Sequence, residues 1–161
     1  MTLNEAQELF SAMCQANEIP EISFDETDSA TLPFGSEGLA LHVQYRRNEG
    51  DIVLIAPVGG LPDDASAVTV LKNCLAANLY WRGTFGATFA WIPAFGQLAL
   101  EYALPVDGLT AESLAVILSD FLTAVESCSQ KLAQPVENQE TAPANGAEAG
   151  LGMKPSEFIA V

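Results

Sequence analysis

The segment NLYWRGTFGATFAWIPAFGQLAL, residues 78–100, decides how this chain folds. It holds six aromatic residues and a single charged one. Gly83 suits the left-handed position that follows many helices. Beyond it, residues 84–93 and 97–105 are rich in aromatic and aliphatic residues that favour strands. The pattern predicts a helix end followed by a β-hairpin that turns at residues 94–96.

The aromatic side chains of this segment leave two interpretations open. A small domain keeps much of its surface exposed, and a large exposed apolar patch marks an interface. The rings could be buried by a second copy of the chain, or they could all pack inside one subunit. The sequence favours neither interpretation. The six residues are Tyr80, Trp81, Phe85, Phe89, Trp91 and Phe95.

Two amphipathic helices flank the hairpin. The first is predicted over 65–81, where apolar residues recur at helical spacing after an acidic turn that suits a helix N-terminus. The second begins after Thr110 as its N-cap and ends before Pro135. The apolar stripe of the first helix is Val68, Leu71, Leu75 and Leu79, and its candidate caps are Asp63, Asp64 and Ser66.

The N-terminal half supplies a third helix and the other strands. Thr2 and Glu5 form a T-x-x-E capping box, and Pro20 ends the helix. A weak strand is predicted at 22–26 and further strands at 29–34, 39–45 and 52–58, the last continuously apolar as in strands covered on both faces. The order α-β-β-β-α-β-β-α predicts an α+β fold with three helices and a mostly antiparallel, twisted sheet.

The chain divides into two parts by composition. Residues 1–132 are predicted to form the α+β domain, since this length can bury a substantial core. Residues 133–161 are rich in Ala, Gly, Glu and Pro, which predicts a flexible tail. The tail ends in an apolar tip that contains Met153, Phe158, Ile159 and Val161.

Composition argues against several classes of partner. The 161 residues carry a net charge of −15, which repels nucleic acid. No apolar run reaches the ~18 residues of a membrane span, and the N-terminus does not resemble a secretory signal. The three cysteines are far apart, as is typical of small buried residues in a reducing compartment, and they do not form a zinc pattern.

Candidate catalytic residues are scarce. His42 is the one histidine, and a histidine in the middle of a strand usually packs at the surface. The acidic pairs lie in predicted turns, where capping and solvation explain them. No phosphate-binding loop or nucleophile elbow is present in the sequence. We therefore expect no enzyme activity, no catalytic residue and no metal site.

Residues 71–132 resemble the second half of the class I type III secretion chaperones, the family of the Tir chaperone. The resemblance lies in a leucine-rich helix that ends in Ala-Asn before aromatic residues, then glycines, a hairpin and a final helix. Residues 3–70 also fit, through the first helix and the run DIVLIAPVGGLPDD. The residues that carry it are Ala77, Asn78, Leu79, Gly83, Gly86, Leu98, Leu100, Leu104, Leu114, Leu118 and Phe121.

This resemblance implies a homodimer in the bacterial cytoplasm that binds the N-terminal region of a secreted effector in extended form. It also implies no cofactor, with the secretion ATPase as a further partner. The implied dimer contact is formed by Val68, Leu71, Leu75, Leu79, Trp81 and Phe89. The implied effector-binding residues are Leu9, Phe10, Met13, Leu32, Phe34, Leu39, Leu41 and Val43.

Two other functions remain open at this point. One is a dimeric protein-interaction domain of the same fold with a regulatory partner outside secretion. The other is an enzyme whose site is assembled from scattered residues, which a deep polar pocket would support.

Overall fold

The computed structural model describes residues 1–34, 39–81 and 83–134. The predicted tail lies outside these residues from position 135 onward, and so does its apolar tip. The elements follow in the predicted order α-β-β-β-α-β-β-α, with a short 3-10 helix after the second α-helix. The predicted α+β fold is therefore confirmed.

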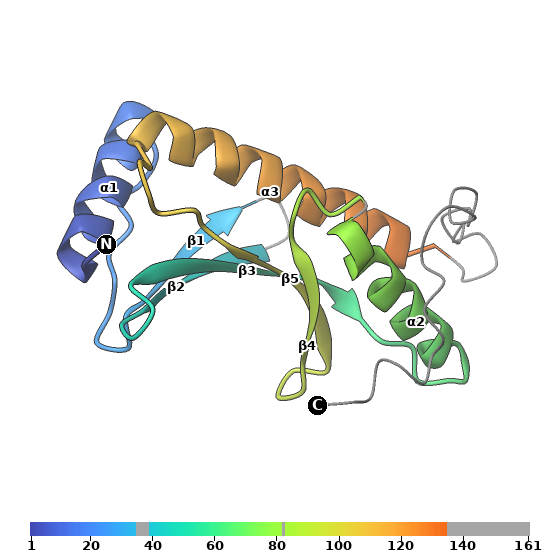
Figure 1. Ribbon diagram of the computed structural model, residues 1–161. Coiled ribbons are helices and arrows are strands. Elements are labelled where there is room, and N and C mark those ends of the chain that lie inside the picture. The colour runs from blue at the N-terminus through green and yellow to red at the C-terminus, as the bar shows by residue number, and fades with distance from the viewer. Residues whose placement is uncertain (35–38, 82, 135–161) are drawn as a thin grey trace, which may run out of the picture.

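One sheet organises the molecule (Figure 1). Its strands lie in the order β1-β2-β3-β5-β4, and every neighbouring pair is antiparallel. The β1-β2-β3 meander and the β4–β5 hairpin therefore meet at the β3–β5 pair. The strands are β1 (Ser29–Phe34), β2 (Leu39–Arg46), β3 (Asp51–Gly60), β4 (Thr88–Ile92) and β5 (Gln97–Ala103).

The helices take two different positions on this sheet. Helices α1 (Leu3–Ala16) and α3 (Ala111–Leu132) pack together over one face, and α3 runs along its length (Figure 1). Helix α2 (Ser66–Asn78) instead lies at one end, against β4. The core fills the layer between α1, α3 and the sheet. Its most deeply buried large side chains include Phe10, Met13, Leu41, Ile52, Leu54, Leu100 and Leu114.

Local signals explain where two of the helices begin. The Thr2 side chain accepts from the backbone of Glu5, and the Glu5 carboxylate accepts from the backbone of Thr2 at 2.7 Å. The predicted capping box is thus confirmed. Thr110 caps α3 in the same way, with Ser113 as its reciprocal partner. At α2 the N-cap is Ala65, and Asp64 contributes by accepting from the Ser66 backbone.

Two predicted boundaries and one predicted strand were wrong, each for a local reason. The second helix ends at Asn78, because Tyr80 and Trp81 adopt left-handed φ angles of 59° and 49°. The first hairpin strand begins only at Thr88, because Phe85 and Gly86 are also left-handed. Residues 22–26 form no strand, since the Gln7 side chain supplies the hydrogen bonds to Ile22 and Phe24 that a neighbouring strand would have made.

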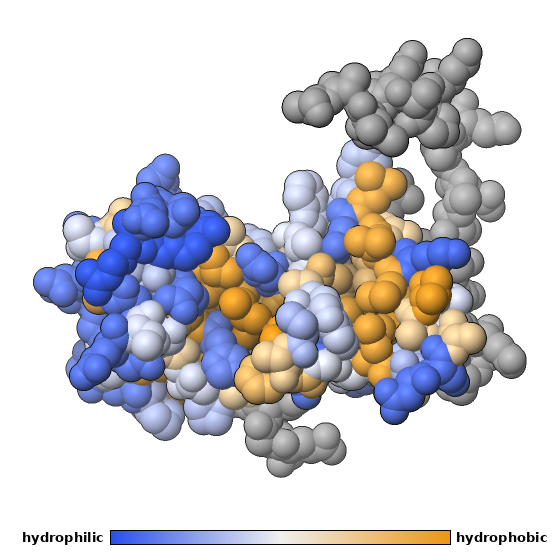
Figure 2. All heavy atoms as spheres, turned by 90° about the horizontal axis from the view of Figure 1, so that it is seen from below, coloured by the Kyte–Doolittle hydropathy of each residue, from blue (hydrophilic) through white to orange (hydrophobic). Residues whose placement is uncertain are grey.

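The predicted cover on both faces of β3 holds only in part among the described residues: Val53, on the outer face, is 3% exposed, but Ile55 and Pro57 on the same face are not fully covered. Ile52 and Leu54 face the core, whereas Val53, Ile55 and Pro57 face away from α1 and α3. In Figure 2, which views this side, apolar residues are visible in the middle of the sheet. Ile55 and Pro57 are only half-buried there, so this face offers apolar surface to a partner.

Candidate interaction surfaces

The first candidate surface is the outer face of α2. Leu75 is 68% exposed and Val68 57%, at the spacing of residues that share one side of a helix. Val70 and Cys74 on the opposite side are buried. Figure 2 shows this apolar stripe running along α2. We call Val68, Leu71, Leu75, Leu79 and Trp81 the α2 surface, and all five are exposed.

The aromatic segment extends this exposed apolar area. Phe85 is 63% exposed and Phe95, in the hairpin turn, is 75% exposed. Phe89 is half-buried because its strand packs against α2. Burial of all six rings inside one subunit is therefore wrong: Tyr80, Trp81, Phe85, Trp91 and Phe95 are exposed in this chain. The alternative interpretation, burial by a second copy, stays a prediction.

Asn78 fixes how α2 meets the sheet. Its side chain accepts a hydrogen bond from the Phe89 backbone N–H at 2.7 Å and donates one to the Phe89 carbonyl at 3.2 Å. These groups lie on the outer edge of β4. The last residue of the helix therefore takes the place of a neighbouring strand, and it holds the exposed side of α2 pointing away from the core.

The second candidate surface is the outer edge of β1. Tyr45 donates its backbone N–H to the Asp28 carbonyl, and the register places Ala30 and Leu32 at equivalent paired positions. Because pairing alternates in antiparallel strands, the backbone groups of Thr31 and Pro33 point outward. Thr31 offers one N–H and one carbonyl, while Pro33 offers a carbonyl alone. This edge can take up a further strand in a restricted register.

Seven of the eight residues predicted to bind an effector fall into two groups. Leu9, Leu32 and Phe34 are partly exposed and pack at the margin of the core. Phe10, Met13, Leu41 and Val43 are buried in the core of this chain, because their strand and helix faces point at α3 and the sheet. The side chain of Leu39 lies outside the described part of the structure. Only the first group can touch a partner without rearrangement.

The side chains that carry chemistry are dispersed over the described residues. No group of three or more His, Cys, Asp or Glu side chains suited to a metal occurs among them. His42 lies on the exposed face of β2, with its Nδ1 3.3 Å from the Thr31 hydroxyl. Burial raises the pKa of the Cys74 thiol to about 11 and also raises that of Cys128. Such thiols are poor nucleophiles.

The ion pairs serve the sheet. Arg46 binds Asp51 across the β2–β3 pair and holds the pKa of that carboxyl below its usual value. Arg47 binds Asp28, which is 8% exposed beside β1.

Among the helices that the structure describes, none has both the length and the apolar character to cross a bilayer.

Comparison with known proteins identifies the family. The model of the Tir chaperone protein (CesT) family matches residues 8–129, and the chain belongs to this family. This is a chaperone family and not an enzyme family. A search among curated proteins finds no match.

Solved structures share the fold at low identity. The chain resembles one in "Crystal Structure of the ExsC-ExsE Complex", with a TM-score of 0.69, 20% identity and coverage of 81% of this chain and 95% of that one. It resembles a chain in "Structure of the HopA1-SchA Chaperone-Effector Complex", with a TM-score of 0.63, 14% identity and coverage of 80% and 95%. A chain of the heterodimeric ExoU-SpcU complex from the type III secretion system of Pseudomonas aeruginosa gives a TM-score of 0.52, 16% identity and coverage of 77% and 93%.

Sequence reasoning did not assign a role to every exposed ring. Tyr80, Phe85, Trp91 and Phe95 were not among the predicted dimer residues, although they are as exposed as several that were. Their positions in the sequence gave no signal, because Tyr80 and Phe85 have left-handed φ angles and Phe95 lies in the hairpin turn. The glycines around them, Gly83, Gly86 and Gly96, were the available hint.

Proposed function

We propose that this protein is a type III secretion chaperone. It acts as a homodimer in the bacterial cytoplasm, binds the N-terminal segment of a secreted effector in extended form and keeps it soluble and competent for export. The secretion ATPase is then its second partner. Membership of the Tir chaperone family over residues 8–129 carries this proposal. The likeness to a chain in a complex described as chaperone and effector supports it.

The α2 surface fits the dimer contact. When a partner covers an exposed leucine such as Leu75, its apolar surface is removed from water. This burial favours association by about 25 cal/mol per Å² of apolar area. A twofold axis beside α2 brings the same stripe of both copies together, so each side chain is used twice. Tyr80, Trp91 and Phe95 enlarge the patch toward the ~800 Å² per partner typical of specific interfaces.

The β1 edge fits the effector segment. An extended chain gains main-chain hydrogen bonds by adding to a sheet edge, and side-chain pockets next to the edge give selectivity. Thr31 can pair with both backbone groups of one effector residue, and Leu9, Leu32 and Phe34 are the partly exposed side chains nearby from the predicted set. The buried Phe10, Met13, Leu41 and Val43 support this surface from below.

The two surfaces are separate, which suits the proposed division of labour. The sheet order places β1 at one edge and β4, with α2, at the other. A dimer built on α2 therefore leaves both β1 edges open, so one effector segment can reach from one copy to the other. The net charge of −15 keeps such a complex soluble while part of its client is unfolded.

The test is to express the full chain together with the N-terminal and the C-terminal fragments of a large effector encoded nearby. We expect only the N-terminal fragment to co-purify, in a complex of two chaperone chains to one fragment by light scattering. Hydrogen exchange should show that the bound fragment is protected in short strand-like stretches and lacks a cooperative fold of its own.

Two results would contradict the proposal. A chain that stays monomeric and binds neither fragment would remove its basis. Selective binding of a folded protein that is not exported would instead favour the regulatory interaction domain described above.

A further inference from the structure

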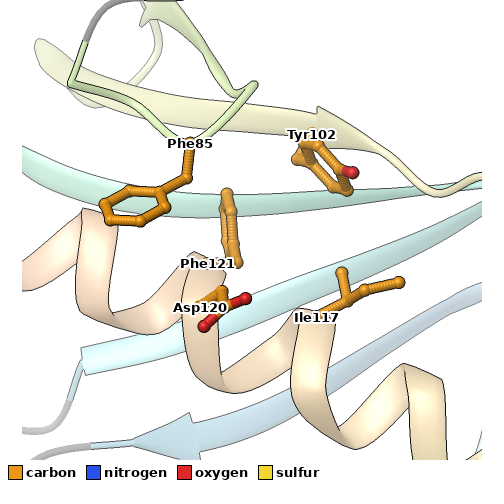
Figure 3. Close-up of a pocket in the computed structure, with 5 residues that line it drawn as sticks. All are labelled: Phe85, Tyr102, Ile117, Asp120 and Phe121. Carbon is orange, nitrogen blue, oxygen red and sulfur yellow. The ribbon is translucent and has the colours of Figure 1, made fainter.

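A small pocket of about 100 Å³ lies between α3, β5 and the loop that precedes β4 (Figure 3). Three aromatic rings line it together with one aliphatic and one acidic side chain. Tyr102 and Phe121 contact each other, with their ring centroids 6.2 Å apart. The lining residues are Phe85, Tyr102, Ile117, Asp120 and Phe121.

The loop holds Phe85 at the mouth of this pocket. Phe85 adopts a φ of 53°, which is unusual for a bulky residue, and it is still 63% exposed. The next residue, Gly86, has a φ of 89°, and a Cβ there would lie 3.2 Å from the Tyr102 ring. The glycine thus lets the loop approach Tyr102 closely. A strained, exposed ring beside a pocket is a feature that partner binding can explain.

The acidic side chain at the pocket, Asp120, has no partner among the residues that the structure describes. It is exposed, and it forms no hydrogen bond or ion pair with any of them. In Figure 3 its carboxylate lies beside the Phe121 ring, with Ile117 one helical turn away on α3. An apolar side chain that filled this pocket would take water from the carboxylate without replacing its hydrogen bonds, which costs free energy.

We propose that this pocket receives an arginine side chain from the effector segment bound by the proposed chaperone. The inference therefore rests on the proposed function. A guanidinium can stack on aromatic faces and donate two hydrogen bonds to one carboxylate, while its aliphatic stem packs on an apolar side chain. Phe85 and the half-buried Tyr102 offer the faces, the buried Phe121 forms the floor, Asp120 supplies the carboxylate and Ile117 the apolar contact.

Size and charge both favour this occupant. Pockets that enclose small-molecule ligands have ~300 Å³ or more, so about 100 Å³ suits one side chain rather than a metabolite. The net charge of −15 attracts a basic effector segment over long range. The pocket then fixes the position of one arginine of that segment on the chaperone. The pocket therefore adds selectivity for a cation to the backbone pairing and apolar contacts proposed at β1.

The test uses two short peptides and needs no effector. The blocked tripeptide acetyl-Ala-Arg-Ala-amide is titrated into the full chain, and its citrulline counterpart, which keeps the shape without the charge, serves as the matched ligand. NMR signals of the Ile117 methyl groups and the Phe85 ring are followed. We expect saturable shifts with the arginine peptide and roughly tenfold weaker binding of the citrulline peptide, as for the loss of one charged hydrogen-bonded pair.

Variants separate the pocket from the acidic surface in general. Asp120→Asn should weaken the arginine peptide about tenfold, and Phe85→Ala should weaken it while the dispersion of the spectrum stays native. Glu126→Gln removes the same charge from another exposed site on α3 and should change binding less than twofold.

Three results would overturn the inference. The first is equal binding of the arginine and citrulline peptides. The second is NMR shifts that spread evenly over the acidic residues. The third is dissociation of the dimer by the Asp120→Asn substitution, which would assign the pocket to a second copy. Because these measurements need no client, they can fail while co-purification of an effector fragment succeeds, and the reverse.

Discussion

The side-chain amide of Asn78 replaces a neighbouring strand for Phe89. It binds both backbone groups of that residue, at 2.7 and 3.2 Å, and so joins the last residue of α2 to the outer edge of β4. This contact sets the orientation of the exposed side of α2 and of the aromatic loop that follows it. A strand edge left open at this position would invite pairing with other chains.

Asn78→Ala should therefore destabilise the domain and loosen the β4 edge. Two partly buried backbone groups lose their partner, which costs roughly 1–3 kcal/mol in the free energy of unfolding. Urea denaturation followed by fluorescence measures this loss, and hydrogen exchange at the Phe89 amide shows whether the edge has opened. Asn78→Asp keeps the acceptor but places a carboxylate against the Phe89 carbonyl, so we expect it to lose stability as well while retaining protection of that amide.

An exposed polar residue on α3 gives the matched control. Gln130→Ala should leave the denaturation midpoint within error. If Asn78→Ala behaves in the same way, the contact does not hold α2 to the sheet.

The cysteines report on the same region. Cys74 lies on the buried side of α2, and burial raises the pKa of its thiol to about 11 from 9.0. The folded state thus disfavours the thiolate, so the domain should lose stability as pH rises from about 9 toward 11, and none of this loss should occur below pH 8. Thiol-reactive dyes at pH 8 should react with Cys74 only at the rate of unfolding. Rapid labelling of the native protein would contradict the packing of α2 described here.

Leu75 provides the sharpest test of the proposed dimer. Its side chain is 68% exposed in this chain, so Leu75→Ala should not destabilise an isolated subunit. In a twofold dimer the loss counts once in each copy, and roughly 1.5 kcal/mol per side chain gives about 3 kcal/mol, or more than a hundredfold in Kd. Sedimentation equilibrium measures the change.

Val116 offers the control, because it is 57% exposed on α3, outside the α2 surface. Val116→Ala should leave the dimer Kd unchanged. A dimer that survives Leu75→Ala but not Val116→Ala would place the contact on α3.

Much of the fold could be predicted because its signals are local. The capping box at Thr2 and Glu5 and the alternation of Leu41, Val43 and Tyr45 each depend on a few neighbouring residues, and both are confirmed. The boundaries that failed lie where left-handed residues end an otherwise continuous pattern. The residue types of Tyr80 and Phe85 do not indicate this geometry, because the left-handed conformation is commonly adopted only by glycine, asparagine and aspartate.

The surfaces were harder to predict than the fold because α2 is apolar on both sides. Val70 and Cys74 are buried, and Val68 and Leu75 are exposed, yet all four have similar hydropathy. On β2 the alternation was clear but did not say which face the helices cover. The family resemblance assigned Leu41 and Val43 to the effector, although they lie in the core of this chain. Only the arrangement of α1, α3 and the sheet decides that question.

The β1 edge gives the most direct test of how an effector binds. The backbone N–H of Thr31 points outward and is the one donor between the loop before β1 and Pro33 on this edge. Thr31→Pro removes it while remaining compatible with an edge strand. We expect the affinity for the bound effector fragment to fall about tenfold, as for the loss of one hydrogen bond together with a steric clash at the paired position.

Thr31→Val keeps the backbone donor and should bind as the unchanged protein does, which separates the backbone from the side chain. Titration calorimetry measures both affinities, and equal urea midpoints show that the fold is intact. If Thr31→Pro binds the fragment with undiminished affinity, strand addition at β1 is not the binding mode, and the apolar outer face of β3 around Ile55 becomes the surface to test.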